Sequence, residues 1–154
     1  MRKWRERMTT KKDTNPKDAV GCKKVSWTVL PFVVLGEVAL AIFEGARKYG
    51  KFNWRKKGVR ASIYIDAVIG RHLAAWWEGE DIDKESGVSH LSKAIAGLMI
   101  LRDAQIRGMM TDDRPPGTRD FVRIQNRAAS AIIDRHPVAE EPVTHADADS
   151  ILYF

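Results

Sequence analysis

Two glutamates on an otherwise apolar stretch are the residues of this chain whose type and spacing best suit chemistry. Residues 31–50 read PFVVLGEVALAIFEGARKYG, and Glu37 and Glu44 are the only acids among them. The composition predicts a helix that is hydrophobic on almost every side and therefore packs inside a bundle. Seven residues are close to two helical turns, so both carboxylates lie on one stripe of that helix.

Two carboxylates on a buried stripe need a cation beside them, because like charges removed from water are unfavourable. A divalent metal ion is one such cation. The ammonium group of Lys48, four residues after Glu44, is another. Both interpretations stay open for Glu44. Glu37 has no Lys or Arg three or four residues away, which favours the metal ion as its partner.

A strongly basic loop follows this helix. The stretch from Arg47 to Arg60 holds seven Lys or Arg and no acid, with an amide and an indole near its middle. Cations bind phosphate groups, an aromatic ring stacks on a base, and an Asn amide offers both a donor and an acceptor to a purine edge. A solvated charged loop is the alternative. The residues predicted to contact a nucleotide are Lys48, Lys51, Asn53, Trp54 and Arg55, with Trp27 as a second candidate for stacking.

A second helix is predicted over residues 61–78, where Asp66 shares a face with three apolar side chains. An aspartate inside a helix is a poor helix former, so we expect it to have a partner: a metal ion, an arginine or a cap. His72 lies about 120° round the helix from Asp66. It is either a base near the site or a hydrogen-bonded packing residue. The other residues of this region predicted to contact a substrate are Arg71 and His90.

The turn GEDIDKESG, residues 79–87, is rich in carboxylates and connects to a third helix predicted over 88–107. Its spacing does not match a calcium loop, and a helix cap formed by Asp83 or Ser86 explains part of it. The acids of this turn are further candidates for a metal site: Glu80, Asp81 and Asp83.

Length and composition favour one helical domain with two tails. The predicted parts are a basic arm over residues 1–24, a helical core over 25–111, and an extension over 112–154 with a short helix and an acidic tail. No apolar run is long enough to cross a membrane, and the single Cys22 fits the reducing cytoplasm. No P-loop and no G-x-G-x-x-G phosphate cradle occurs.

The net charge of +6 resides in the first 24 residues, which hold nine Lys or Arg and three acids. A small, basic, helical DNA-binding protein is therefore an alternative to an enzyme. Two observations argue against a DNA-binding protein. Residues 25–154 have no net charge, and the buried acids would gain nothing from binding DNA. A nucleotide sensor that binds a dNTP without hydrolysing it is a third hypothesis.

Two long strings carry a resemblance to a known family. They are EGARKYG-x-x-NW over residues 44–54 and RH-x-x-x-WWEGEDID-x-x-SG-x-x-H over residues 71–90. Over residues 15–116 the chain resembles phage dATP/dGTP diphosphohydrolases, which are similar to the all-α MazG-type NTP pyrophosphohydrolases. The resemblance implies an all-α bundle completed by oligomerisation, as a homodimer or homotetramer. We also expect no membrane and no stable nucleic-acid partner.

The activity implied by the resemblance is hydrolysis of a purine dNTP to a dNMP and pyrophosphate with two or more Mg²⁺ or Mn²⁺ ions. We expect dGTP to be favoured, with dATP possible, in the host cytoplasm. In phages that replace adenine with 2-aminoadenine, such an enzyme would supply dGMP. The chain departs from the MazG pattern E-E-x-x-E followed by E-x-x-D. Glu37 carries over best, Glu44 and Asp66 come next, and the acids of residues 80–83 follow.

Overall fold

The computed structural model describes Lys17 and residues 24–144, and the chain divides into two compact units, residues 1–113 and 114–154. Where it is described, the first unit is helical apart from two short strands, which confirms the predicted all-α class. Its elements are η1 (Trp27–Val29), α3 (Phe32–Tyr49), α4 (Trp54–Lys57), β1 (Val59–Arg60), α5 (Ala61–Asp66), η2 (Ala67–Leu73), α6 (Ala74–Trp77), α7 (His90–Ile106) and β2 (Met110–Thr111).

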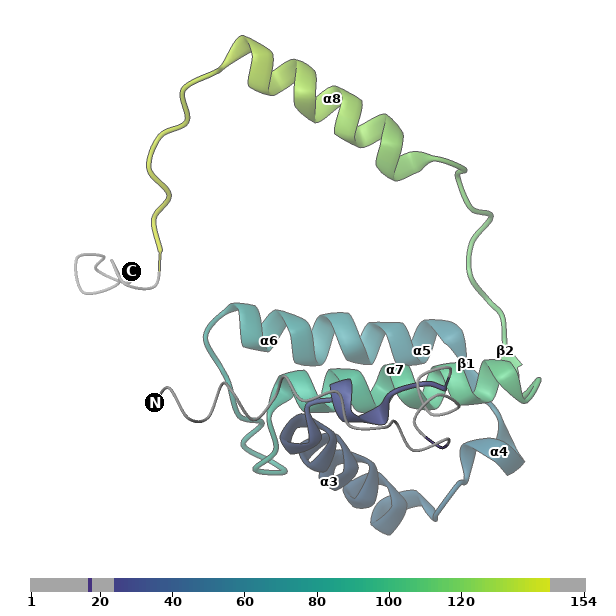
Figure 1. Cartoon of the computed structure of the whole chain (residues 1–154). Helices are drawn as coiled ribbons and strands as arrows, with labels where there is room; N and C mark the ends of the chain where they lie inside the picture. The colour runs from purple at the N-terminus through teal and green to yellow at the C-terminus, as the bar shows by residue number, and fades with distance from the viewer. Residues whose placement is uncertain (1–16, 18–23, 145–154) are drawn as a thin grey trace. The chain divides into compact units, whose positions relative to one another are not determined.

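Helix α7 is the centre of the first unit. Helix α3 packs on one side of it, and the helix formed by α5, η2 and α6 packs on the other (Figure 1). Small residues allow this close packing, because Ala94, Ala96 and Ala104 of α7 are almost fully buried. A Cβ added to Gly97 would lie only 3.0 Å from Val68 Cγ2 of η2. Side chains of the two outer helices can therefore meet beside α7.

Helix α3 forms where the sequence predicts it. Pro31 precedes its first turn, and Gly50 ends it with a φ of 94°. Val38 is buried against α7, whereas Leu40 and Phe43 are 58% and 63% exposed. The sequence predicted that α3 is buried on almost every side. Within one chain this is not so, because only one side of α3 packs against α7.

The second predicted helix is continuous through α5, η2 and α6, but its middle is π-helical. A π-helical turn is wider than an α-helical one and is frequent at functional sites. Within η2, Val68 and His72 face the interior of the unit and are 3% and 8% exposed. The periodicity that predicted this helix did not predict its π-helical middle.

A two-residue parallel pair, β1 with β2, joins the segments that follow α4 and precede the second unit. Gly58 leads into β1 with a φ of 74°, and a Cβ at this position would lie 2.8 Å from the Met109 carbonyl oxygen. Both the positive φ and the close backbone require glycine here.

Gly58→Ala is expected to lower the free energy of unfolding by about 2 kcal/mol or more, from backbone strain plus the clash with Met109. Urea unfolding followed by circular dichroism measures the change. Gly87→Ala is the matched control, because Gly87 has a similar φ of 68° and no neighbouring atom within 4 Å. An equal effect at both positions would show that the contact with Met109 contributes nothing.

The second unit contains helix α8 (Phe121–Arg135), which confirms the short helix predicted within residues 112–154. Asp120 precedes it with a φ of 59° and accepts a hydrogen bond from Arg123. The apolar side chains of α8, such as Ile124 and Ile132, are about half exposed.

Most of the predicted arm, and the end of the predicted tail, lie outside the described residues. The proposed domain limits stay predictions. Within residues 24–144 no helix is long and apolar enough to cross a membrane.

Candidate active site

A polar pocket of about 370 Å³ lies between α3, η2, the acidic turn after α6 and the first turns of α7. Four elements contribute charged or titratable side chains to it. They are Glu44 and Lys48 of α3, Arg71 and His72 of η2, Asp83 and Glu85 of the turn, and Lys93 of α7. The pocket therefore brings together five residues predicted from the sequence to act at a site, and it adds Glu85 and Lys93.

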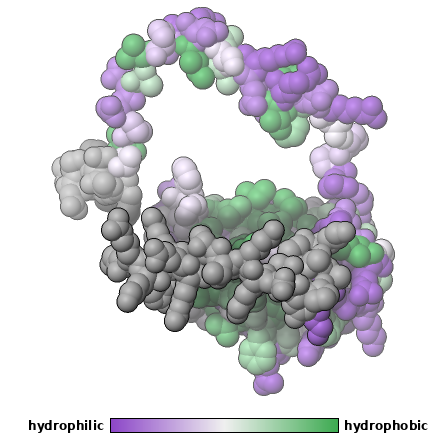
Figure 2. Space-filling view, viewed as in Figure 1, coloured by the Kyte–Doolittle hydropathy of each residue, from purple (hydrophilic) through white to green (hydrophobic). Residues whose placement is uncertain are grey.

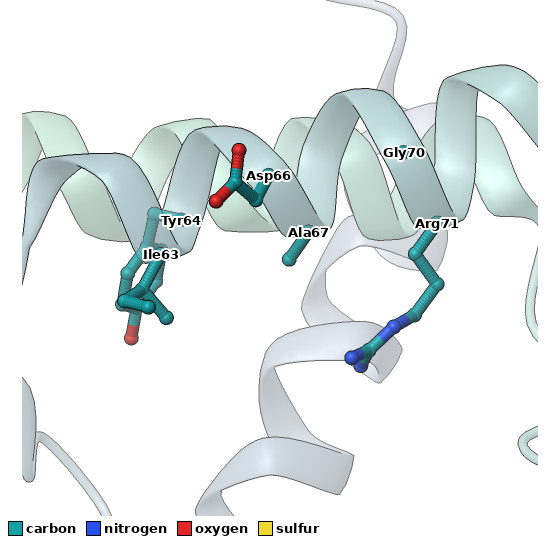
Figure 3. Close-up of a pocket in the computed structure, with 6 residues that line it drawn as sticks. All are labelled: Ile63, Tyr64, Asp66, Ala67, Gly70 and Arg71. Atoms are coloured by element: carbon teal, nitrogen blue, oxygen red, sulfur yellow. The ribbon is translucent and has the colours of Figure 1, made fainter.

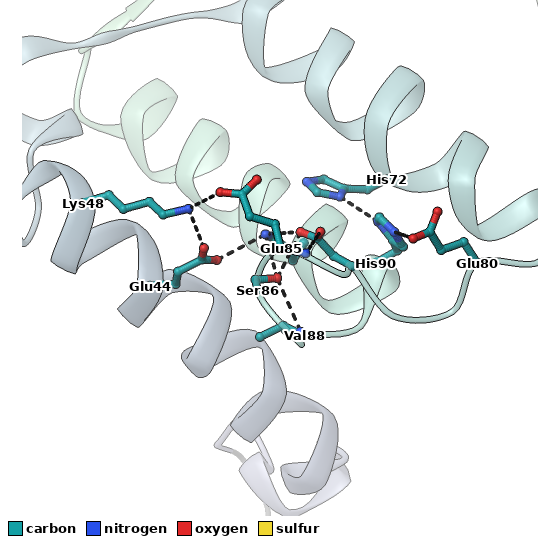
Figure 4. Close-up of polar contacts among 10 residues, drawn as sticks. Glu44, Lys48, His72, Glu80, Glu85, Ser86, Val88 and His90 are labelled. Atoms are coloured by element: carbon teal, nitrogen blue, oxygen red, sulfur yellow. Dashed lines mark hydrogen bonds and ion pairs between the residues drawn. The ribbon is translucent and has the colours of Figure 1, made fainter.

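Two lysines link the carboxylates of this pocket. Lys48 Nζ lies 2.6 Å from Glu44 Oε1 and 2.9 Å from Glu85 Oε1, which Figure 4 shows. Lys93 Nζ lies 3.2 Å from Glu44 Oε2 and also binds Asp83 Oδ2. The i,i+4 pair between Glu44 and Lys48 is the one that sequence spacing indicated. Lys93 and Glu44 are 49 positions apart, so sequence spacing gave no sign of their contact.

These contacts keep the carboxylates ionised. The hydrogen bond from Lys93 holds the pKa of Asp83 far below its usual range. The hydrogen bond from Lys48, helped by Lys93, lowers the pKa of Glu44. Glu44 and then Glu85 in turn raise the pKa of Lys48. At neutral pH the carboxyl groups of Glu44 and Asp83 and the amino group of Lys48 are therefore charged.

The lowered pKa values predict a loss of stability in acid. A carboxyl whose pKa is lower in the folded chain binds fewer protons than in the unfolded chain, so its contribution is present above the unfolded pKa. It is lost as pH falls through the folded pKa. We expect the free energy of unfolding to fall below about pH 5, as Glu44 and then Asp83 are titrated. Urea unfolding between pH 3 and 7 measures this, and Asp83→Asn should flatten the acid side of the curve.

Glu37 and Asp66, which were also predicted as metal ligands, do not line the polar pocket. Glu37 Oε2 accepts a hydrogen bond of 2.7 Å from Ser92 Oγ, a buried hydroxyl of α7. Asp66 lies on the exposed side of its helix, in a shallow and mainly apolar depression that also contains Tyr64 and Arg71 (Figure 3). Its predicted apolar stripe is exposed too, with Trp77 at 78%, because α7 packs against the opposite side of the helix.

The acids of the turn are only partly gathered at the pocket. Glu80 pairs with Lys84 at 3.3 Å, and Asp81 accepts the His90 backbone N–H through its carbonyl oxygen. Within the described part of the chain, no three Asp, Glu, His or Cys side chains converge as a group that could hold a metal ion. The predicted set Glu37, Glu44 and Asp66 is thus not assembled within one chain.

Glu44 and Asp83 nevertheless have the donor chemistry of a magnesium site. Both carboxylates bind one cation, the Lys93 ammonium group, so their oxygens lie within reach of a common positive charge. Mg²⁺ and Mn²⁺ prefer such ionised oxygen ligands, and Mg²⁺ is commonly held by one or two carboxylates plus phosphate oxygens. These two residues therefore have the ligand chemistry that a divalent ion requires.

The basic loop makes a different set of contacts. Trp54 is buried, and its Nε1–H donates to Asp103 Oδ2 of α7 at 2.7 Å. Arg55 binds both oxygens of Asp103, at 2.8 and 2.9 Å, and its guanidinium lies 4.8 Å from the Phe52 ring centroid. Lys51 also lies over Phe52. The contacts of Trp54 and Arg55 with Asp103 connect α4 to α7, and Asp103 was not singled out from the sequence.

The remaining predicted nucleotide contacts are outside the polar pocket. Asn53 precedes α4 without a side-chain capping hydrogen bond, and Trp27 is 70% exposed on η1.

Trp54→Phe is expected to destabilise the fold by about 1–2 kcal/mol, through the lost hydrogen bond to Asp103 and a small cavity. Because the indole is buried and its N–H is already bound, we expect KM for a nucleotide to change by less than about twofold. Thermal unfolding and steady-state kinetics test the two parts separately. A large rise in KM without loss of stability would restore Trp54 as a stacking residue.

The two predicted histidines contact each other, and His72 lines the polar pocket whereas His90 does not. His72 and His90 are both buried, and their Nδ1 atoms are 3.0 Å apart. Arg71, the residue before His72, lines both the polar pocket and the apolar depression. The site thus combines cations that suit a polyphosphate with an adjacent apolar surface.

Comparison with known proteins gives the family. The family model described as dATP/dGTP diphosphohydrolase, N-terminal, matches residues 14–114. A dATP/dGTP diphosphohydrolase of Salmonella phage PMBT28 is 34% identical over 89 residues, which cover 54% of this chain and 30% of that protein. The chain therefore spans about a third of the length of that relative, and no solved structure matches it. On the family match, which covers α3, the acidic turn and α7, this chain belongs to the dATP/dGTP diphosphohydrolase family.

Proposed function

We propose that this chain hydrolyses a purine dNTP to the dNMP and pyrophosphate, with dGTP favoured and dATP possible. The observation that carries the proposal is the polar pocket, in which Lys48, Arg71 and Lys93 meet the ionised carboxylates of Glu44 and Asp83. Cations that suit a triphosphate lie beside acids that suit a divalent ion. A purine dNTP is proposed as the substrate because the phage relative is named a dATP/dGTP diphosphohydrolase.

The charge and polarity of the two neighbouring surfaces suggest how the nucleotide binds. The triphosphate binds in the polar pocket, where Lys48 and Lys93 exchange their carboxylate partners for phosphate oxygens. The base lies in the apolar depression beside Tyr64, because Arg71 lines both spaces and connects them. Of the residues predicted from the basic loop, Lys51 and Asn53 remain candidates for contacts with the nucleotide.

Mg²⁺ or Mn²⁺ belongs to this proposal. Glu44 and Asp83 would hold the ion, and Glu37, Asp66 and Asp81 remain candidates to complete its ligands. Such an ion would acidify the attacking water and neutralise charge on the phosphates. The protein side chains orient the triphosphate and keep its charge balanced.

An oligomer is the second part of the proposal. Large apolar side chains of α3 and α6 are exposed in one chain, including Leu40, Phe43 and Trp77, and Figure 2 shows hydrophobic surface on the helical unit. A homodimer or homotetramer would cover this surface. Light scattering of the purified chain measures its mass directly.

The test of the reaction is a product assay. The purified chain is incubated with each of the four dNTPs, with Mg²⁺, with Mn²⁺ or with EDTA, and the products are resolved. We expect metal-dependent dGMP and pyrophosphate from dGTP in equal amounts, and slower turnover of pyrimidine nucleotides. In an infected cell this reaction would take place in the host cytoplasm. No turnover of any nucleotide in either metal would overturn the proposal, and salt-sensitive DNA binding without metal would replace it.

A further inference from the structure

The hydrogen positions of the buried pair His72–His90 follow from the groups around the two rings. The two Nδ1 atoms are 3.0 Å apart, so one of them donates a hydrogen and the other accepts it. Two neutral arrangements satisfy this contact. They differ in whether the Nε2 atom of His72 carries a hydrogen or a lone pair.

His90 Nε2 decides between the two arrangements. It is the one buried side-chain nitrogen or oxygen, among the residues that the structure describes, without a hydrogen-bond partner. Glu80 Oε1 lies 4.0 Å from it. Without a hydrogen, His90 Nε2 would direct its lone pair at the Glu80 carboxylate, and these two hydrogen-bond acceptors would repel each other. With a hydrogen, Nε2 donates towards Glu80 after a small movement of that half-exposed side chain, and the Nδ1 of His90 becomes the acceptor.

The tautomer of His72 follows from this. Its Nδ1 carries the hydrogen that His90 accepts, so its Nε2 carries a lone pair. His72 lines the polar pocket, and Figure 4 shows its second nitrogen on the side of the ring away from His90. Burial first, and then the charge of Lys93, lower the pKa of His72, which Asp83 opposes. The ring is therefore neutral at pH 7 and can accept a proton.

We propose that His72 is the general base of the hydrolysis, and that His90 and Glu80 are positioning residues that hold its tautomer. A water oxygen forms a bond to a phosphorus of the α,β-bridge while its proton passes to His72 Nε2. The bond from that phosphorus to the bridging oxygen breaks, its electron pair stays on the leaving oxygen, and dNMP and pyrophosphate result. The inference rests on the proposed function and names the group that takes the proton.

The tautomers can be measured without substrate or metal. Long-range ¹H–¹⁵N correlation spectra of the full chain labelled at histidine distinguish Nδ1–H, Nε2–H and charged rings. We expect His72 as Nδ1–H and His90 as Nε2–H at pH 7.5, with assignments from His72→Ala and His90→Ala. His136, which is exposed in the second unit, is the internal reference. An Nε2–H or charged His72 would overturn the inference.

Kinetics test the role of the base. His72→Ala should lower kcat for dGTP about 100-fold or more, and added imidazole should restore at least tenfold of this loss. Glu80→Gln keeps an acceptor oxygen for His90 and should retain activity, whereas Glu80→Leu should lose about tenfold. His136→Ala should match the wild type. Full activity of His72→Ala, or a folded His72→Ala chain that imidazole does not rescue, would overturn the role.

The outcomes separate this inference from the proposed function. A wild-type chain that hydrolyses no dNTP overturns both. Wild-type hydrolysis together with an unimpaired His72→Ala chain overturns only the general base.

Discussion

A Glu44→Gln chain is expected to hydrolyse dGTP about 100- to 1,000-fold more slowly than the wild type while keeping its fold. Glu44 binds Lys48 and Lys93 at once, and it is the only acid of α3 that lines the polar pocket within the described residues. Gln keeps the size and one acceptor oxygen but removes the charge that a divalent ion and the two lysines require. Steady-state kinetics with dGTP and Mg²⁺ measure the effect as a loss in kcat.

Two further variants make this result specific. Glu78→Gln removes an exposed carboxylate at the end of α6, outside the pocket, and should leave kcat unchanged. Glu37→Gln tests the other acid of the α3 stripe, and full activity would remove Glu37 from the metal site. A Glu44→Gln chain as active as the Glu78→Gln control would contradict the placement of the reaction in this pocket.

Lys93→Met is expected to lower the free energy of unfolding by about 3 kcal/mol at pH 7. The Lys93 side chain is only 15% exposed and lies between Glu44 and Asp83. Met keeps the length of the side chain but leaves two carboxylates facing each other without the ammonium group. Urea unfolding at pH 7 and at pH 4 measures this, and the difference should shrink at pH 4 as the carboxylates take up protons.

The control for Lys93 is Lys84→Met. Lys84 also pairs with a carboxylate, that of Glu80, but its side chain is 88% exposed. A surface pair of this kind contributes about 0–1 kcal/mol, so Lys84→Met should be nearly neutral. Equal effects of the two substitutions, or an effect of Lys93→Met that does not depend on pH, would show that the buried pairs do not stabilise the fold.

The sequence predicted the elements well because helical periodicity and helix ends are local signals. Pro31 and Gly50 bound α3 as expected, and the i,i+4 spacing of Glu44 and Lys48 indicated their pair. The π-helical segment of η2 was missed, because its seven residues are too few for a change of helical period to be read from the apolar spacing.

The site was only partly predictable, because its decisive contacts are long-range. Lys93 reaches Glu44 across 49 positions, and Asp103 binds Trp54 and Arg55 across about as many. Nothing in the spacing of these residues shows that they meet. The basic loop looked like a phosphate site from composition alone, whereas Trp54 and Arg55 are bound to α7. The family strings located the acidic turn and both histidines, but not the contact between His72 and His90.

The most direct test of the proposed binding site is a crystal structure of the chain with Mg²⁺ and a dGTP analogue whose α,β-bridging oxygen is replaced by a methylene group. The triphosphate should lie in the polar pocket, in contact with Lys48, Arg71 and Lys93, with Mg²⁺ between the phosphates and the carboxylates of Glu44 and Asp83. The base should lie in the apolar depression beside Tyr64. A triphosphate bound to the basic loop over residues 51–57, with Lys93 still paired to both carboxylates, would contradict the proposed binding site.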